Sequence, residues 1–125
     1  MWKENALKRL KGSGYKLTPQ RLKLVEILDR IGSEHPSLKK VLGEIREEFP
    51  TMSFSTLYSN VLTLKELGLL ELFSLDGETR VELNTKPHIN LISGGKVIDL
   101  NDPEIIERIR EKTGRNVRLV NVVLD

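Results

Sequence analysis

Residues 53–68 read SFSTLYSNVLTLKELG, and this stretch carries most of the information about the fold. Ser53 suits a helix N-cap, because its hydroxyl can accept a hydrogen bond from a backbone amide of the first turn. Gly68 is a typical residue at a helix end. Between them, apolar residues recur at the helical period, at Leu57, Val61, Leu64 and Leu67. The stretch is therefore predicted to form one amphipathic helix.

The opposite face of this predicted helix is polar but uncharged. No charged residue occurs from Met52 to Leu64, whereas an ordinary solvated helix would carry Lys and Glu there. Short hydrogen-bonding groups and one aromatic ring suit base edges and thymine methyl groups in the major groove of DNA. These residues are Ser55, Thr56, Tyr58, Ser59, Asn60 and Thr63. We interpret the helix as a recognition helix, with a merely solvated helix as the alternative.

Three more helices are predicted before this one. Thr18-Pro19 and Ser37 are helix starts, because the hydroxyls can cap and proline fits the first turn. Gly32 and Pro50 are helix ends. The predicted helices cover residues 3–11, 19–31 and 38–49, the last with an apolar stripe that runs to Phe49.

A hairpin is predicted after the recognition helix. The extended runs 69–75 and 80–84 are separated by Asp76-Gly77-Glu78-Thr79, and Asp-Gly between extended runs is a strong hairpin signal. Helices followed by such a hairpin make a winged helix-turn-helix, which we expect over residues 1–85 as a DNA-binding domain.

The remaining residues, 86–125, are predicted to form a small α/β domain. Asp102-Pro103 is a good helix start, and Gly114 ends this helix. The run Val117–Leu124 is rich in β-branched residues, so a strand buried on both faces is expected. About forty residues are too few for a stable lone core, which favours burial across a homodimer interface; a core shared with the first domain is the alternative. The fold class is α+β.

Composition indicates a globular protein rather than a disordered or membrane-spanning one. Of 125 residues, 38% are hydrophobic and 30% are charged, and no apolar run is long enough to cross a membrane. The chain has no cysteine, which excludes disulfides, and we expect a cytoplasmic location. The net charge is only +2, but residues 1–25 carry seven basic side chains against the single acid Glu4. A basic end on a more acidic body favours a polyanionic partner.

Several short motifs resemble the ferric uptake regulator (Fur) family in order and spacing. They are Leu17-Thr18-Pro19-Gln20-Arg21, His35-Pro36-Ser37, Glu48-Phe49-Pro50, Ser53-Phe54-Ser55-Thr56-Leu57-Tyr58, Leu64-Lys65-Glu66-Leu67-Gly68-Leu69, Val81-Glu82-Leu83-Asn84, Pro87-His88 and Gly95-Lys96-Val97-Ile98-Asp99. The resemblance implies a transcription regulator, expected to be a repressor, that binds near-palindromic double-stranded operator DNA as a homodimer. It further implies that Tyr58 and its neighbours contact DNA and that Lys16 contacts the phosphate backbone. The expected DNA-binding residues are Lys16, Gln20, Arg21, Ser55, Thr56, Tyr58, Ser59 and Asn60.

The resemblance also implies a regulatory divalent metal that bridges the two domains. The matching positions are His35, Glu82, His88, Asn90 and Asp99. Asn90 stands where the family has a second histidine, and an amide oxygen suits harder ions than imidazole does. We therefore expect weakened metal dependence, with Mn²⁺, Fe²⁺ or Zn²⁺ as candidates and selectivity drifting toward Mn²⁺. A vestigial site that binds no metal is the open alternative.

A structural zinc, which the family holds with two Cys-x-x-Cys pairs, is impossible in a chain without cysteine. Gly94-Gly95 lies where the first pair is expected, and we predict that a tight two-residue turn closes the hairpin there instead. Two other functions are alternatives for this sequence: a winged helix that binds protein within a transcription complex, and a metallohydrolase. The uncharged helix face and the basic N-terminus argue against the first, and nothing in the sequence suggests a catalytic loop for the second, so no enzyme activity is expected.

Overall fold

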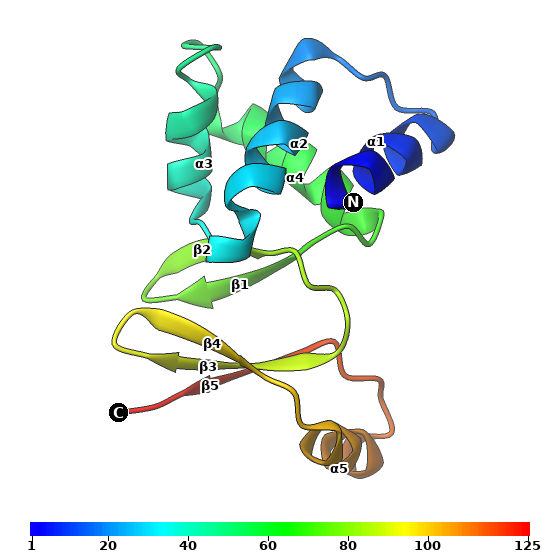
Figure 1. Cartoon of the computed structure of the whole chain (residues 1–125), viewed down its shortest axis with the longest axis vertical. Coiled ribbons are helices and arrows are strands. Elements are labelled where there is room, and N and C mark those ends of the chain that lie inside the picture. The colour runs from blue at the N-terminus through cyan, green and yellow to red at the C-terminus, as the bar shows by residue number, and fades with distance from the viewer. The chain divides into compact units, whose positions relative to one another are not determined.

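The structure is a computed structural model that describes residues 1–125, the whole chain. The chain divides into two compact units, Met1–Asn84 and Thr85–Asp125. The helices and strands of both units are labelled in Figure 1. No helix combines the length and the apolar character needed to cross a membrane.

The first unit consists of helices followed by a two-stranded hairpin. Its elements are α1 (Trp2–Gly12), α2 (Pro19–Ile31), the short 3₁₀ helix η1 (Gly32–Glu34), α3 (Leu38–Ile45), α4 (Phe54–Glu66), β1 (Glu71–Leu75) and β2 (Glu78–Glu82). The predicted caps are confirmed: Thr18, Ser37 and Ser53 each accept a hydrogen bond from the backbone amide three residues later. Local side-chain chemistry thus sets the starts of α2, α3 and α4.

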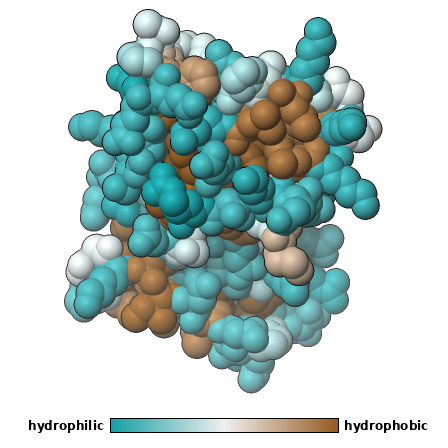
Figure 2. Space-filling model, turned by 45° about the horizontal axis from the view of Figure 1, so that its top comes forward, coloured by the Kyte–Doolittle hydropathy of each residue, from teal (hydrophilic) through white to brown (hydrophobic).

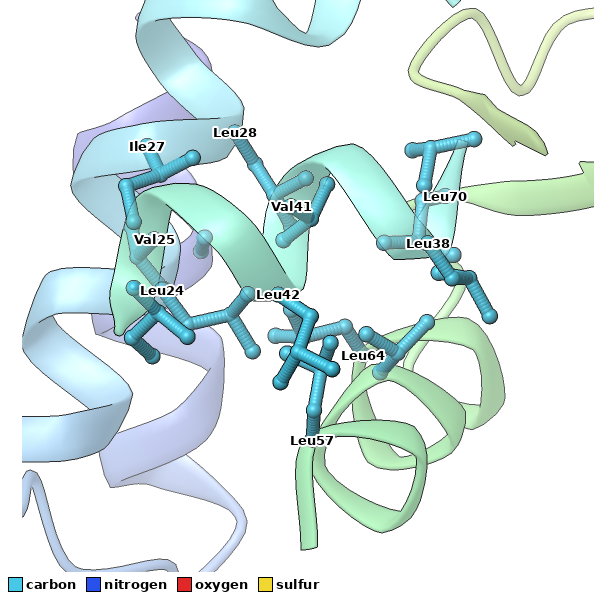
Figure 3. Close-up of a cluster of buried hydrophobic side chains, with 14 of the residues drawn as sticks. Leu24, Val25, Ile27, Leu28, Leu38, Val41, Leu42, Leu57, Leu64 and Leu70 are labelled. Atoms are coloured by element: carbon cyan, nitrogen blue, oxygen red, sulfur yellow. The ribbon is translucent and has the colours of Figure 1, made fainter. Parts of the chain in front are cut away.

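The core of this unit lies between α2, α3 and α4 (Figure 3). Leu28, Val41 and Leu57 are fully buried, one from each helix. Figure 3 also shows Leu70, which precedes β1, close to Leu38 at the start of α3. α1 is joined to a part of the unit that is distant in sequence, because the Trp2 indole Nε1 donates a hydrogen bond to the Leu69 carbonyl at 2.8 Å.

The hairpin is joined directly to the helices. Asp76 and Gly77 form its two-residue turn with positive φ angles of 51° and 79°, the conformation that favours Asp-Gly. The Val81 amide donates to the Pro36 carbonyl at 2.9 Å, which fixes β2 beside the start of α3. Helices α2 to α4 and this hairpin form a winged helix-turn-helix, as the sequence predicts.

The second unit is a three-stranded sheet with one helix. β3 (His88–Ser93) is central, β4 (Lys96–Leu100) pairs with it antiparallel, and β5 (Leu119–Val123) pairs with it parallel. α5 (Pro103–Thr113) connects β4 to β5. The predicted turn at Gly94-Gly95 is present, with φ angles of 56° and 78°.

Two sequence expectations were wrong in detail. α3 ends at Ile45 rather than Phe49, because Glu47 and Glu48 donate back only three residues and the last turn tightens. β2 begins at Glu78 rather than Arg80, which shortens the hairpin loop to two residues.

β5 was expected to be buried on both faces with the help of a homodimer interface; in the single chain it is an edge strand that pairs only with β3, so this expectation stays a prediction. Val123 keeps 77% of its surface exposed, and α5 contributes no buried residue.

Figure 2 shows a largely hydrophilic surface interrupted by hydrophobic patches. The large exposed hydrophobic residues are Met1, Leu22, Phe54, Tyr58, Ile98, Ile105, Val123 and Leu124.

Candidate nucleic-acid interface and metal ligands

The polar face of α4 is open to solvent along the first turns of the helix. Ser55, Thr56, Tyr58 and Ser59 are exposed, and Asn60 is half-buried. Ser53 caps the helix by accepting from the Thr56 amide at 3.1 Å, and its hydroxyl donates to the Thr56 hydroxyl at 2.9 Å. The predicted contact residues of α4 are therefore collected on one accessible face at a capped helix start.

Two aromatic rings form one edge of this face. Phe54 and Tyr58 are one helical turn apart and stack with ring centroids 5.9 Å apart and planes 11° apart. Phe54 is 49% exposed and Tyr58 is 38% exposed. Sequence reasoning singled out Tyr58 and missed Phe54, although their spacing of four residues on a predicted helix was a usable signal.

An open groove of about 610 Å³ lies along the other edge of the face, between the starts of α2 and α4. Its lining is mostly polar and includes the caps of both helices. The residues that line it are Thr18, Gln20, Arg21, Phe49, Thr51, Met52, Ser53, Ser55, Thr56, Ser59 and Asn60. Lys16 precedes this groove in the chain, and its side chain is exposed.

Arg21 is held by contacts within the protein. Its Nε donates to the Asn60 Oδ1 at 3.1 Å, and its Nη1 donates to the Lys16 carbonyl at 2.9 Å. Its guanidinium carbon lies 5.3 Å from the centre of the Tyr15 ring. Asn60 in turn donates from Nδ2 to the Thr56 carbonyl at 3.1 Å. Arg21 thus links the loop before α2 to the recognition helix.

In the first unit, two of the predicted metal ligands are in contact. The His35 Nε2 lies 2.9 Å from the Glu82 Oε2, and the other oxygen of Glu82 accepts from the Asn84 amide at 2.9 Å. His35 has a φ of 54°, a left-handed conformation that follows η1, and its carbonyl accepts from Arg80 at 3.2 Å. An imidazole and a carboxylate are thereby presented side by side.

In the second unit, three predicted ligands lie on one face of the sheet. His88 and Asn90 are two residues apart on β3, and Asp99 of β4 is directly opposite Asn90. The His88 Nδ1 is 2.7 Å from the Lys86 carbonyl, so a neutral ring donates from Nδ1 and carries its lone pair on Nε2. Asn90 donates from Nδ2 to the Asn121 Oδ1 at 3.3 Å.

The first unit is a winged-helix module of the DNA-binding type, and a small α/β unit follows it. The sequence profile of the ferric uptake regulator family matches residues 12–125. A ferric uptake regulation protein homolog of Archaeoglobus fulgidus is 54% identical over 125 residues, which cover 100% of this chain and 98% of that protein.

Two solved structures are also similar. The Campylobacter jejuni peroxide stress regulator is 32% identical with a TM-score of 0.67, over 95% of this chain and 94% of that one. The Helicobacter pylori ferric uptake regulator Fur is 25% identical with a TM-score of 0.73, over 98% and 91%. The chain belongs to the ferric uptake regulator family, a family of metal-responsive transcription regulators, and the resemblance inferred from its motifs is confirmed.

Proposed function

We propose that the protein is a homodimeric repressor that binds near-palindromic double-stranded operator DNA through the winged helix of each protomer. The observation that carries the proposal is the exposed, uncharged face of α4, which offers hydroxyls and aromatic rings at the start of a helix. Arg, Lys and Glu are usual on a solvated helix, whereas short polar groups and apolar rings suit base edges in the major groove. The family membership agrees with this reading.

In this proposal the contacts divide into two kinds. Ser55, Thr56, Tyr58, Ser59 and Asn60 face base edges, and Lys16, Gln20 and Arg21 lie toward the phosphate backbone. Lys16 and Gln20 have exposed side chains that can reach phosphates. Arg21 and Asn60 in addition hold the two parts of this surface together, because each is the other's hydrogen-bond partner.

The decisive test is selection of a duplex from a random library, followed by measurement of its affinity across salt concentrations. Each phosphate contact is expected to contribute about −0.9 to the slope of log K against log salt concentration. Lys16→Ala should reduce that slope by about one contact, while Lys65→Ala, near the end of α4, serves as the control. Affinity that is insensitive to salt, or no enriched sequence, would indicate the protein-binding module instead.

The homodimer is proposed to form through the unit Thr85–Asp125. In one chain, Ile105 of α5 is 41% exposed, and Val123 of β5 and Leu124 just after it are also exposed. Apolar surface of this kind is stabilised when a second copy covers it. Ile105→Glu should produce a monomer in sedimentation, whereas Glu104→Gln, one residue earlier, should leave the dimer intact. A dimer that survives Ile105→Glu argues against this interface.

A divalent ion is proposed to be held by His35, Glu82, His88, Asn90 and Asp99. Two imidazoles, two carboxylates and an amide oxygen form a donor set that suits Mn²⁺, Fe²⁺ or Zn²⁺. The hydrogen bond from His88 to the Lys86 carbonyl supports the site, because such a partner orients the ligand nitrogen of a metal-binding histidine. Because the ligands come from both units, a bound ion would favour one arrangement of the two winged helices in the dimer.

The metal dependence is proposed to be weakened by Asn90. Asn90→His should raise the affinity for Zn²⁺, measured by competition with a chromogenic chelator, and His88→Ala should lower it. Asn101→His, which adds an imidazole outside the donor set, is the control. The affinity for DNA is then measured with and without one equivalent of each ion. If the affinity is the same with and without the ion, and His88→Ala does not change it, metal control is contradicted.

A further inference from the structure

The ring of Phe54 lies outside the hydrophobic core of its own unit and lines a shallow pocket beside the start of α3 and the hairpin turn. It is the first residue of α4 and keeps 49% of its surface exposed, whereas Leu57 and Val61 of the same helix are fully buried. Its neighbour on the surface is Tyr58, whose ring lies nearly parallel to it. Two solvent-facing rings therefore stand together at the end of the helix that enters the groove in the proposed complex.

The chemistry of this edge differs from that of the rest of the face. Ser55, Ser59 and Thr56 offer hydroxyl groups, while the edge at Phe54 and Tyr58 offers aromatic carbon. In the major groove, the apolar feature of a base pair is the 5-methyl group of thymine. No Lys or Arg precedes Lys65 on this helix, so its first turns carry none of the long basic side chains that make bidentate contacts with guanine.

The distance between the Phe54 and Tyr58 rings can be compared with the spacing of bases along DNA. Their centroids are 5.9 Å apart. Successive bases along one strand are about 3.4 Å apart, so this separation corresponds to one or two base steps. The two rings are therefore spaced so that each can meet a different base along one strand.

We propose that Phe54 is a specificity-determining residue that takes the 5-methyl group of a thymine, one or two base steps from the base that Tyr58 contacts. The inference rests on the proposed function, and it deepens it by assigning a second apolar base contact. A purely structural role for Phe54, in which its ring only positions that of Tyr58, makes a different prediction. In that case the effect of removing Phe54 disappears once Tyr58 is gone.

The test replaces each thymine of the selected operator, one at a time, with deoxyuridine, which removes only the methyl group. Affinities of the full-length dimer are measured by fluorescence anisotropy for the wild type, Phe54→Ala, Tyr58→Ala and the double variant. Loss of one buried methyl contact is expected to weaken wild-type binding about fourfold. Leu22→Ala, which removes a side chain of similar exposure from α2, is the matched control.

The expected result is one thymine whose deoxyuridine penalty vanishes in Phe54→Ala but persists in Tyr58→Ala and in Leu22→Ala. Phe54→Leu, which keeps an apolar side chain without the ring, should retain part of the penalty. The proposal is overturned if no thymine shows a penalty, if Phe54→Ala keeps every penalty, or if Phe54→Ala has no effect in the Tyr58→Ala background. Failure of the wild type to select any sequence refutes the proposed function itself, and this is seen before any variant is made.

Discussion

Replacing Arg21 with alanine should destabilise the first unit and displace the start of the recognition helix. The guanidinium makes two hydrogen bonds and one cation–π contact, and these join Tyr15 and Lys16 in the loop before α2 to Asn60 on α4. A net contribution of about 1 kcal/mol is typical for each hydrogen bond. An exposed cation–π contact adds about 0.5–1 kcal/mol. Arg21→Ala should therefore lower the free energy of unfolding by about 2–3 kcal/mol.

Arg21→Lys separates charge from geometry. A lysine keeps the positive charge, but its single ammonium cannot replace the planar fork that reaches the Asn60 Oδ1 and the Lys16 carbonyl together. It should recover less than half of the lost stability. Unfolding in urea, followed by circular dichroism at one fixed protein concentration, measures both variants. Gln20→Ala, at the exposed neighbouring position, is the control and should change stability by less than about 0.5 kcal/mol.

The salt dependence of operator binding distinguishes this role from a direct phosphate contact. If Arg21 mainly holds the loop and α4 together, Arg21→Lys weakens binding even though the charge is kept. If Arg21 instead contacts a phosphate, Arg21→Ala lowers the salt slope by about one contact and Arg21→Lys restores it. Wild-type stability in Arg21→Ala combined with that salt behaviour would refute the argument from the hydrogen bonds.

Three further substitutions test the fold of the first unit, each by urea unfolding against the wild type. Leu57→Ala, at a fully buried position, should cost about 2–5 kcal/mol, and a cost below 1 kcal/mol would contradict the assigned core. Gly77→Ala forces a side chain into a φ of 79° and should cost about 1 kcal/mol; an unchanged midpoint would mean that the turn differs. Ser53→Ala removes the α4 cap and should cost about 1 kcal/mol, with faster amide exchange at Thr56, and unchanged exchange there would argue against the cap.

The starts of the helices were predictable because capping is local. Thr18, Ser37 and Asp102 each cap the helix that the sequence assigns to them, and the determinants lie within three residues. The two hairpin turns were predictable for the same reason, since Asp76-Gly77 and Gly94-Gly95 favour the positive φ angles that they adopt.

The exposure of β5 was not predictable from its composition. A run of β-branched residues indicates a buried strand, but burial depends on which neighbours cover it. In one chain β5 has β3 on a single side, so Val123 stays exposed. The sequence of β5 is typical of a buried strand, whereas the strand is partly exposed in one chain. This mismatch is the reason to propose that a second copy covers it.

The candidate interface shows the same limit at the level of single side chains. The sequence identifies Arg21 and Asn60 as polar residues in or near a recognition helix. It does not indicate that these two residues, 39 positions apart, are hydrogen-bond partners. Hydrogen-bond partners of this kind follow from the packing of α2 against α4, which no local pattern encodes. Phe54 was missed for a related reason: a phenylalanine at a helix start looks like a core residue until its exposure is known.

The proposed metal ligands differ in how they are held without metal, and this bears on the strength of metal control. Both oxygens of Glu82 have partners, the His35 imidazole and the Asn84 amide, whereas Asn90 contacts Asn121 through Nδ2 and not through the oxygen that would hold a metal. Ligands that already have partners in the protein must exchange those contacts for the ion, so only the difference between the two sets of contacts favours binding. The same partners stabilise each unit when no ion is bound. In the proposed site, an Asn90 amide in place of an imidazole would reduce that difference further, which is the physical basis for proposing a weakened metal response.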